Sequence, residues 1–129
     1  MFTLDQIKSA HAKVKSGADF PRYFQDIKLL GVHSYETYVR DGHTIYSGAD
    51  QYQIQSEPKY DALPVAQNPD PETFRHRLKI HQQGQTDFPT FCKDSAASGV
   101  EKWIVEMNSM TCTYLSRSGE LIHTEKIPG

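Results

Sequence analysis

The sequence predicts an α+β fold in which an antiparallel sheet packs against helices. Four segments have the apolar spacing of helices, and period-two alternation typical of strands follows each pair of them. Two similar stretches, "ADFPRYFQDIKLLGV" (residues 18–32) and "TDFPTFCKDSAASGV" (residues 86–100), introduce the second helix of each pair. Each half of the chain therefore has the predicted order α-α-β-β-β, and such runs of helices and then strands are typical of α+β folds.

The length and composition predict one compact domain. The chain has 129 residues, of which 37% are hydrophobic and 23% charged, as is ordinary for a single globular domain. A chain of this size buries roughly two thirds of the surface that it exposes when unfolded, which suffices for stability without disulfides or metals. We expect half-repeats over about 1–57 and 70–128, a proline-rich connector over 58–69, and no cofactor.

The first half begins with two predicted helices. Residues 3–6 (TLDQ) form a capping box, in which Thr3 and Gln6 satisfy each other's backbone N–H groups. This helix is expected to run to about Ser16, with Gly17 as its stop. The second helix follows "DFP" (19–21), where proline near the first turn costs no hydrogen bond, and ends at Gly31.

Three strands complete the first half. The segments 32–39 and 43–47 flank Arg40-Asp41-Gly42, and the Asp-Gly pair predicts a hairpin turn. A third strand is expected over 51–56, where apolar and glutamine residues alternate.

The second half repeats this order after the connector. "EPKYDALPVAQNPDP" (57–71) contains four prolines and predicts an extended segment. A helix then opens at Asp70-Pro71 and closes at Gly84, and a fourth opens at "DFP" (87–89) and ends at Gly99. Strands are predicted over 100–107, 111–116 and 121–127, with Ser118-Gly119 turning the last pair.

The two halves agree in sequence at an offset of 68 residues, which is the distance from Asp19 to Asp87. The nine identical pairs are Asp19/Asp87, Phe20/Phe88, Pro21/Pro89, Asp26/Asp94, Gly31/Gly99, Val32/Val100, Tyr46/Tyr114, Ile54/Ile122 and Glu57/Glu125. An internal repeat explains these pairs, because a half of some sixty residues buries too little apolar surface alone. The alternative is that "DFP" and "GV" are independent signals for starting and stopping a helix.

The second half resembles a known family. The segment "HQQGQTDFPTFCKDSAASGVEKWIVEMNSMTCTYLSRSGELIHTEKIP" (81–128), and more loosely "LPVAQNPDPETF" (63–74), is similar to the YbcV-like family of small bacterial proteins of unknown function. Members often carry the label "phage envelope protein". The resemblance implies a bacterial or prophage-derived origin and a compact α+β domain, with no activity, cofactor or catalytic residue to transfer.

Charge and hydropathy restrict the classes of partner. The net charge of −2 and the pI near 6.3 give no strong field for nucleic acid or anionic membrane, so binding to nucleic acid is not expected. The basic segment "RHRLKIHQQG" (75–84) fits a solvated helix face, although contact with phosphate is the alternative. Since neither a membrane span nor a signal peptide is apparent, we expect a cytoplasmic protein. The partner is unknown, and a homodimer is compatible with the sequence.

Cysteine and histidine residues give weak signals for chemistry. Cys92 and Cys112 are expected to be reduced, buried thiols, because Cys92 aligns with Phe24 and Cys112 alternates with threonines. A thiolate paired with a histidine remains the alternative. No Cys-x-x-Cys or paired histidine spacing predicts a metal site, and His11 is expected to pack in the core or between helices.

The candidate ligand-binding residues are Tyr46, Glu57, Tyr114 and Glu125. They are the polar or amphipathic side chains that the predicted repeat keeps on its strands, and they could frame a polar groove between the halves. In the alternative, each glutamate closes its own sheet through a backbone N–H or a basic neighbour.

Two function classes follow from these residues. The favoured one is a non-catalytic binding or protein-interaction module, which an exposed Trp103 or an unpaired strand would support. The other is a small enzyme that uses a Cys/His pair or the Glu57 and Glu125 carboxylates in a pocket.

Overall fold

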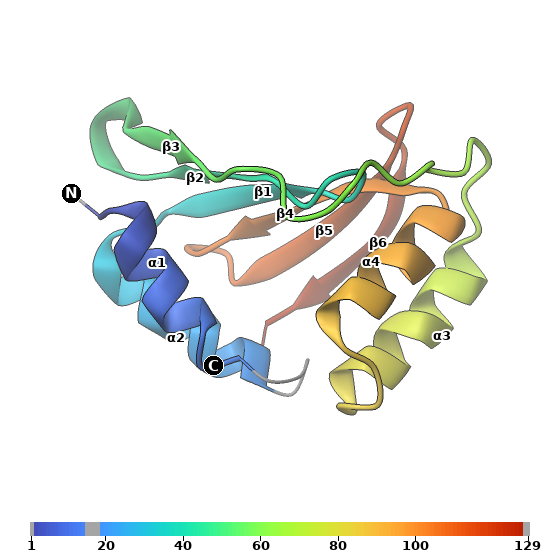
Figure 1. The fold of residues 1–129 in the computed structure, drawn as a ribbon, viewed down its shortest axis with the longest axis horizontal. Helices are drawn as coiled ribbons and strands as arrows, with labels where there is room; N and C mark the ends of the chain where they lie inside the picture. Colours follow the sequence, from blue (N-terminus) through green and yellow to red (C-terminus); the bar gives the residue numbers. More distant parts are fainter. Residues whose placement is uncertain (1, 15–18, 128–129) are drawn as a thin grey trace.

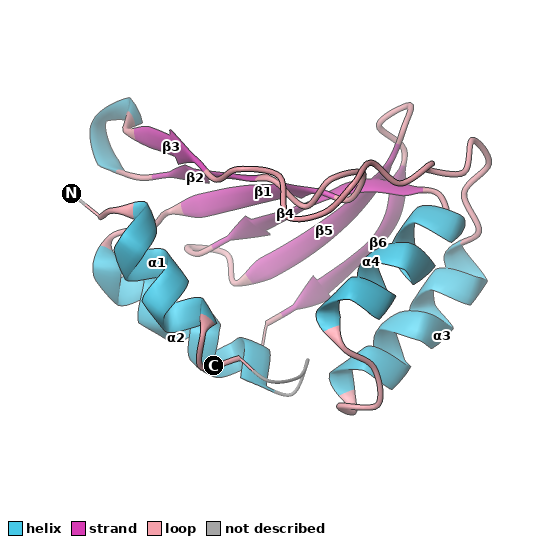
Figure 2. Cartoon of the chain, in the orientation of Figure 1, coloured by secondary structure: helices cyan, strands magenta, loops and turns pink. Residues whose placement is uncertain are grey.

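In the part of the chain that the structure describes, one antiparallel sheet has four α-helices on one of its faces (Figures 1 and 2). The structure is a computed structural model, and it describes residues 2–14 and 19–127. Side chains alternate between buried and half-exposed along the central strands, as expected when helices cover one face of a sheet. The predicted α+β class is therefore correct.

The helices form two pairs, each preceding three strands in the chain. Within each pair the helices pack against each other, and a broad gap separates the pairs in the ribbon view (Figure 1). Their bounds are α1 Leu4–His11, α2 Phe20–Leu30, α3 Pro71–Gln82 and α4 Phe88–Ala97.

Local capping signals explain where these helices begin and end. The predicted capping box of α1 is present, with Gln6 N donating to Thr3 Oγ1 at 3.2 Å and Thr3 N donating to Gln6 Oε1 at 2.9 Å. Asp87 caps α4 by accepting from Thr90 N at 2.9 Å. Gly31 follows α2 with φ of 107°, a left-handed conformation that favours glycine.

Helix α1 is shorter than predicted. It ends at His11 rather than near Ser16, because Lys13 N and Val14 N donate to the carbonyls three residues earlier, those of Ala10 and His11. This tighter pattern closes the last turn of a helix. The predicted stop at residues 16 and 17 lies outside the described residues.

The six strands that the structure describes belong to a single antiparallel sheet, as the sequence predicted, and each half contributes three of them. The strand order is β3-β2-β1-β4-β5-β6, and every pair is antiparallel. The bounds are β1 Ser34–Tyr38, β2 Thr44–Ser47, β3 Gln53–Gln55, β4 Val100–Glu106, β5 Thr111–Ser116 and β6 Leu121–Lys126. A short 3₁₀ helix, η2 (Ala49–Gln51), precedes β3 and was not predicted.

The central pairing of β1 with β4 joins the halves in a symmetric register. Tyr35 pairs with Val105, and Thr37 pairs with Trp103. Adding the offset of 68 to Tyr35 gives Trp103, and adding it to Thr37 gives Val105, so these two pairs exchange under the offset. The register thus agrees with the predicted internal repeat, whose origin by duplication remains a prediction.

The third strands depart from this symmetry by one residue. Tyr46 pairs with Ile54 in the first half, whereas Tyr114 pairs with His123, one residue beyond Ile122. An irregularity in register between Tyr114 and Leu115 accompanies this shift, and such a bulge moves every later side chain along the partner strand.

The connector runs across the ends of the central strands (Figure 1). Lys59 N donates to Asp41 O at 2.7 Å, and Ala66 N donates to Ala96 O at 2.9 Å. The hydroxyl of Tyr60 donates to Val39 O. These bonds place Lys59 beside the β1–β2 turn and hold Ala66 against the C-terminal end of α4.

Candidate functional site

A cavity of about 470 Å³ lies between the helices and the sheet. Its described walls include side chains from all four helices, from every strand except β3, and from the connector. Binding pockets for small molecules commonly measure about 300 to 1,000 Å³. The cavity is therefore large enough for a small organic molecule.

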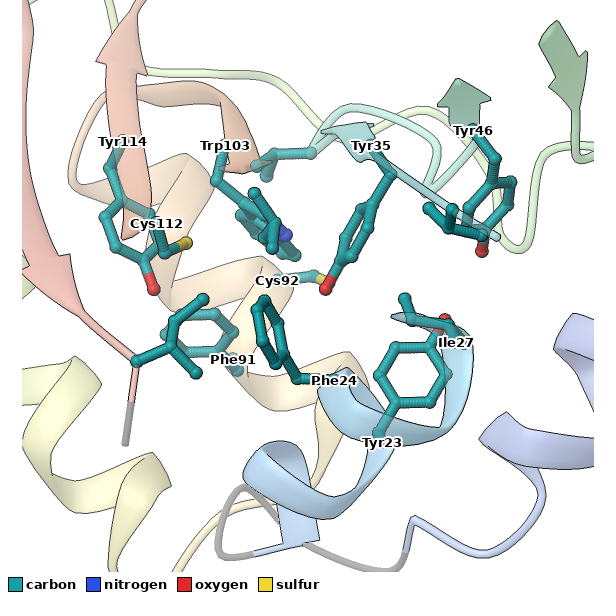
Figure 3. Packing of buried hydrophobic residues seen from close by; sticks show 14 of the residues in the cluster. Tyr23, Phe24, Ile27, Tyr35, Tyr46, Phe91, Cys92, Trp103, Cys112 and Tyr114 are labelled. Carbon is teal, nitrogen blue, oxygen red and sulfur yellow. The ribbon is translucent and has the colours of Figure 1, made fainter. Parts of the chain in front are cut away.

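The sheet side of the cavity carries a row of aromatic side chains. We call these residues the aromatic row: Tyr46, Tyr35, Trp103 and Tyr114, from β2, β1, β4 and β5. Figure 3 shows them side by side, pointing from the sheet toward the helices. Tyr46 pairs with Tyr35 across β2 and β1, and Trp103 with Tyr114 across β4 and β5. The sheet register thus places aromatic side chains on the same face of four neighbouring strands.

Aromatic side chains of the helices form the opposite side. Phe20 and Tyr23 come from α2, and Phe88 and Phe91 from α4. Ring centroids of Phe91 and Trp103 are 5.5 Å apart, and those of Phe88 and Trp103 are 6.3 Å apart. These separations lie in the range of favourable aromatic pairs, so aromatic surface surrounds much of the cavity.

At the β6 side of the cavity, Glu125 is held by uncharged donors. Gln82 Nε2 donates to both carboxylate oxygens at 3.0 Å, and the hydroxyl of Tyr114 donates to Oε1 at 3.1 Å. His123 Nε2 is 3.9 Å from Oε2. The carboxylate of Glu125 is thus already well supplied with hydrogen bonds.

On the other side of the central strand pair, Lys59 contributes its ammonium group. This lysine lines the main cavity and also a smaller pocket with His11, Tyr46 and Ser56. Its Nζ lies 5.6 Å from the centre of the Phe88 ring. Desolvation lowers its pKa below that of a free lysine, because burial disfavours the charged form.

The hydroxyl of Tyr35 differs from those of the other row tyrosines. Tyr114 donates to Glu125, whereas burial raises the pKa of Tyr46, whose hydroxyl also interacts electrostatically with the side chains of Tyr23 and Thr44. Tyr35 is 5% exposed and lines the cavity, and its hydroxyl makes no hydrogen bond to the residues that the structure describes. The fully buried side-chain oxygens without a partner in the described residues are those of Ser95 and Ser98, so the Tyr35 hydroxyl has open space beside it in the cavity.

Both cysteines are free and buried, as the sequence predicted. Burial raises the pKa of Cys92 to about 11 and that of Cys112 to about 12. Cys112 lines the cavity and Cys92 does not lie among its described lining residues. Since the thiolate is the nucleophilic form, neither thiol is activated for chemistry at neutral pH.

The histidines at the cavity serve as packing groups. His11 lies edge-on to Tyr23 and Phe88, and His81 stacks on Phe91 while its Nδ1 lies 3.0 Å from Thr86 Oγ1. Desolvation lowers the pKa of both imidazoles, which favours their neutral forms. In residues 2–14 and 19–127, no histidine hydrogen-bonds a cysteine, and no group of three or more ligand-type side chains could hold a metal ion.

The structure brings three of the four predicted site residues to the cavity. Tyr46, Tyr114 and Glu125 line it, whereas Glu57 is exposed and is not among the described lining residues. The bulge in β5–β6 explains the difference, because Glu125 pairs with Cys112 while Ser56 hydrogen-bonds the equivalent residue, Thr44. The structural counterpart of Glu125 is therefore Ser56.

Several cavity residues were not predicted as site residues, notably Tyr35, Trp103, Phe88 and Lys59. Tyr35 and Trp103 occupy equivalent positions in the predicted repeat and pair with Tyr46 and Tyr114 on the neighbouring strands. A prediction of this strand pairing could have identified them. Lys59 carried no such signal, because it lies in a connector without regular periodicity. Trp103 is 7% exposed, so it does not give the exposed tryptophan that a protein-interaction surface would use.

None of the helices that the structure describes has the length and apolarity needed to cross a membrane.

Comparisons with known proteins identify the family of the chain. No curated protein matches it. Residues 8–126 match the model of a family described as "Protein of unknown function (DUF1398)". Because the match extends over most of the 129 residues, the chain belongs to the DUF1398 family.

Proposed function

We propose that this protein is a non-catalytic binding protein whose cavity holds a small, largely aromatic molecule. The observation that carries the proposal is the cavity of about 470 Å³ between the aromatic row and the aromatic helix side chains. Aromatic walls with a few polar groups are typical of small-molecule sites.

The enzyme alternative has less support. A Cys/His pair needs a thiol with a lowered pKa and a base in contact, whereas burial raises the pKa of Cys112 to about 12. A pair of carboxylates would need Glu57 beside Glu125, but Glu57 is exposed and outside the described lining of the cavity.

Several expectations from the sequence remain predictions. They are membership of the YbcV-like group, a bacterial or prophage-derived origin, a cytoplasmic location and a homodimer. A protein-interaction role also remains as a second form of the binding function, with the edge strand β6 and its 64% exposed Leu121 as the surface to examine.

The test is a titration with N-phenyl-1-naphthylamine, a neutral probe that fluoresces in apolar surroundings. Trp103 is the single tryptophan of the chain and lines the cavity. We therefore expect saturable binding with energy transfer from Trp103 to the probe. A probe whose fluorescence does not increase, or increases without energy transfer from Trp103, would contradict the proposal.

A matched pair of variants locates the probe. Cys112→Phe adds a ring inside the cavity, whereas Thr113→Phe adds the same ring one residue away, where alternation places it on the opposite face of the sheet. We expect binding to be lost in the first variant and kept in the second. Circular dichroism checks the fold, and Cys112→Leu repeats the test if the phenylalanine does not fit.

A further inference from the structure

The titratable groups of the cavity wall leave an excess of positive charge. Lys59 and Lys126 are the described lysines of the wall, and Glu125 is its described carboxylate. Desolvation lowers the pKa of His11 and His81, so both are mainly neutral at pH 7. A ligand with one negative charge would balance the two lysines against Glu125.

Lys59 and Glu125 differ in the hydrogen-bond and ion-pair partners that the protein itself provides for their charged groups. Glu125 accepts hydrogen bonds from Gln82 and Tyr114. Within residues 2–14 and 19–127, no acidic side chain lies within ion-pair distance of the Lys59 ammonium, and no acceptor takes a hydrogen bond from it. The contact that the structure gives this ammonium is the Phe88 ring, at 5.6 Å. Lys59 is exposed as a residue and borders the cavity with its side chain, so its ammonium can form a charge-assisted hydrogen bond with an anionic ligand.

The hydroxyl of Tyr35, which has no described hydrogen-bond partner, belongs to the same cavity wall as Lys59 of the connector. Tyr35 is on β1, and Tyr46, which shares a pocket with Lys59, is its partner on β2. Figure 3 shows the Tyr35 hydroxyl at the end of the side chain that points toward the helices. A hydroxyl in this position can donate to a ligand oxygen.

We propose that the ligand is an aromatic monocarboxylate, whose carboxylate pairs with Lys59 and accepts from the Tyr35 hydroxyl, and whose ring packs against the cavity side of Trp103 and Phe88. The inference rests on the proposed binding function and adds the charge and orientation of the ligand. An aromatic cation would instead be attracted to Glu125, and this alternative is an outcome of the test.

The experiment compares three ligands that share one ring system and differ in charge. They are 1-naphthoate, 1-naphthalenemethanol and 1-naphthylmethylamine, each titrated into the full chain by calorimetry at pH 7. An ionic hydrogen bond in a partly desolvated site predicts that the carboxylate binds about tenfold more tightly than the alcohol.

Two variants test the assigned contacts. Lys59→Met keeps the length of the side chain and should remove the preference for the carboxylate, while the alcohol keeps its affinity within about twofold. Tyr35→Phe removes one hydroxyl and should weaken the carboxylate by about fivefold. The matched control is Lys79→Met, an exposed residue of α3 outside the described lining, which changes the net charge equally and should have no effect.

The outcomes separate this inference from the proposed function. If none of the three ligands binds, the proposed function itself fails. If all three bind equally, the binding function holds and the charge assignment is overturned. Tighter binding of the amine, or a carboxylate preference that survives Lys59→Met, would overturn the assignment as well. Thermal melting of each variant shows whether a loss of binding reflects a loss of fold.

Discussion

The two ends of the cavity occupy equivalent places in the sheet but carry different chemistry. Tyr46 and Tyr114 lie at the same register position in the two halves. Beyond them, Ser56 stands in the first half where Glu125 stands in the second. The inner strands thus carry the aromatic row in both halves, while the edge strand and the connector determine the charge at each end of the cavity.

The same contrast appears in the pairs beside the aromatic row. Thr37 and Thr44 are paired and share a hydrogen bond of 3.0 Å, and their equivalents Val105 and Cys112 are paired without one. One backbone arrangement therefore supports polar groups on one side and apolar groups on the other. A cavity of this kind can orient a ligand that has one polar end.

The largest expected difference between the halves concerns two equivalent glycines. Gly31 and Gly99 both have positive φ, at 107° and 87°, but a Cβ on Gly99 would lie 2.6 Å from Pro69 Cα, whereas one on Gly31 would meet Phe2 at 3.8 Å. We expect Gly99→Ala to lower the free energy of unfolding by about 3 kcal/mol and Gly31→Ala by about 1 kcal/mol. Urea denaturation measures both free energies of unfolding. Equal losses would show that Pro69 of the connector does not pack closely against Gly99 at the end of α4.

A smaller difference is expected between the two glutamates that the sequence aligned. Glu125→Gln disturbs hydrogen bonds from Gln82 and Tyr114 and should cost about 1.5 kcal/mol of stability. Glu57 is exposed, so Glu57→Gln should stay within about 0.5 kcal/mol. Equal effects in thermal melting would mean that the two residues are structural equivalents after all.

Two buried tyrosines of the aromatic row, Tyr114 and Tyr35, should respond differently to loss of the hydroxyl. Tyr114→Phe removes the donor to Glu125 and should destabilise the protein by about 1 kcal/mol. Tyr35→Phe removes a hydroxyl without a described partner, so stability should be unchanged or slightly higher. A loss on Tyr35→Phe as large as that on Tyr114→Phe would reveal a partner for the Tyr35 hydroxyl and weaken the ligand assignment.

The two buried thiols should affect the stability of the protein at alkaline pH but not at neutral pH. Burial raises the pKa of Cys92 to about 11 and of Cys112 to about 12, from 9.0. Because the unfolded chain releases these protons first, stability should be unaffected below about pH 9 and fall as the pH rises toward 11 and 12. Urea denaturation at several alkaline pH values checks this. Replacing both cysteines with alanine should reduce that slope but not abolish it, because burial also raises the pKa of tyrosines such as Tyr114. An unchanged slope would contradict the assignment.

Local signals made much of the secondary structure predictable. The capping box at Thr3 and Gln6, the "DFP" helix starts, and the glycines after α2 and α4 depend on residues within a few positions of one another. The predicted end of α1 was wrong, because the change to a tighter hydrogen-bond pattern at Lys13 has no clear sequence signal.

Long-range features were harder to predict. The pairing of β1 with β4 joins residues that are far apart in the chain, and no local pattern encodes it. The bulge between Tyr114 and Leu115 moved Glu125 one residue out of alignment with Glu57, which an alignment without gaps cannot show. Tyr46 and Tyr114 were found because they lie before this shift.

The most direct test of the account is a crystal structure of the protein grown with 1-naphthoate. The account predicts density for the naphthalene ring in the cavity against Trp103 and Phe88, with the carboxylate within ion-pair distance of Lys59 and hydrogen-bonded to Tyr35. A naphthoate bound outside the cavity, or one whose carboxylate points toward Gln82 and Glu125, would contradict it.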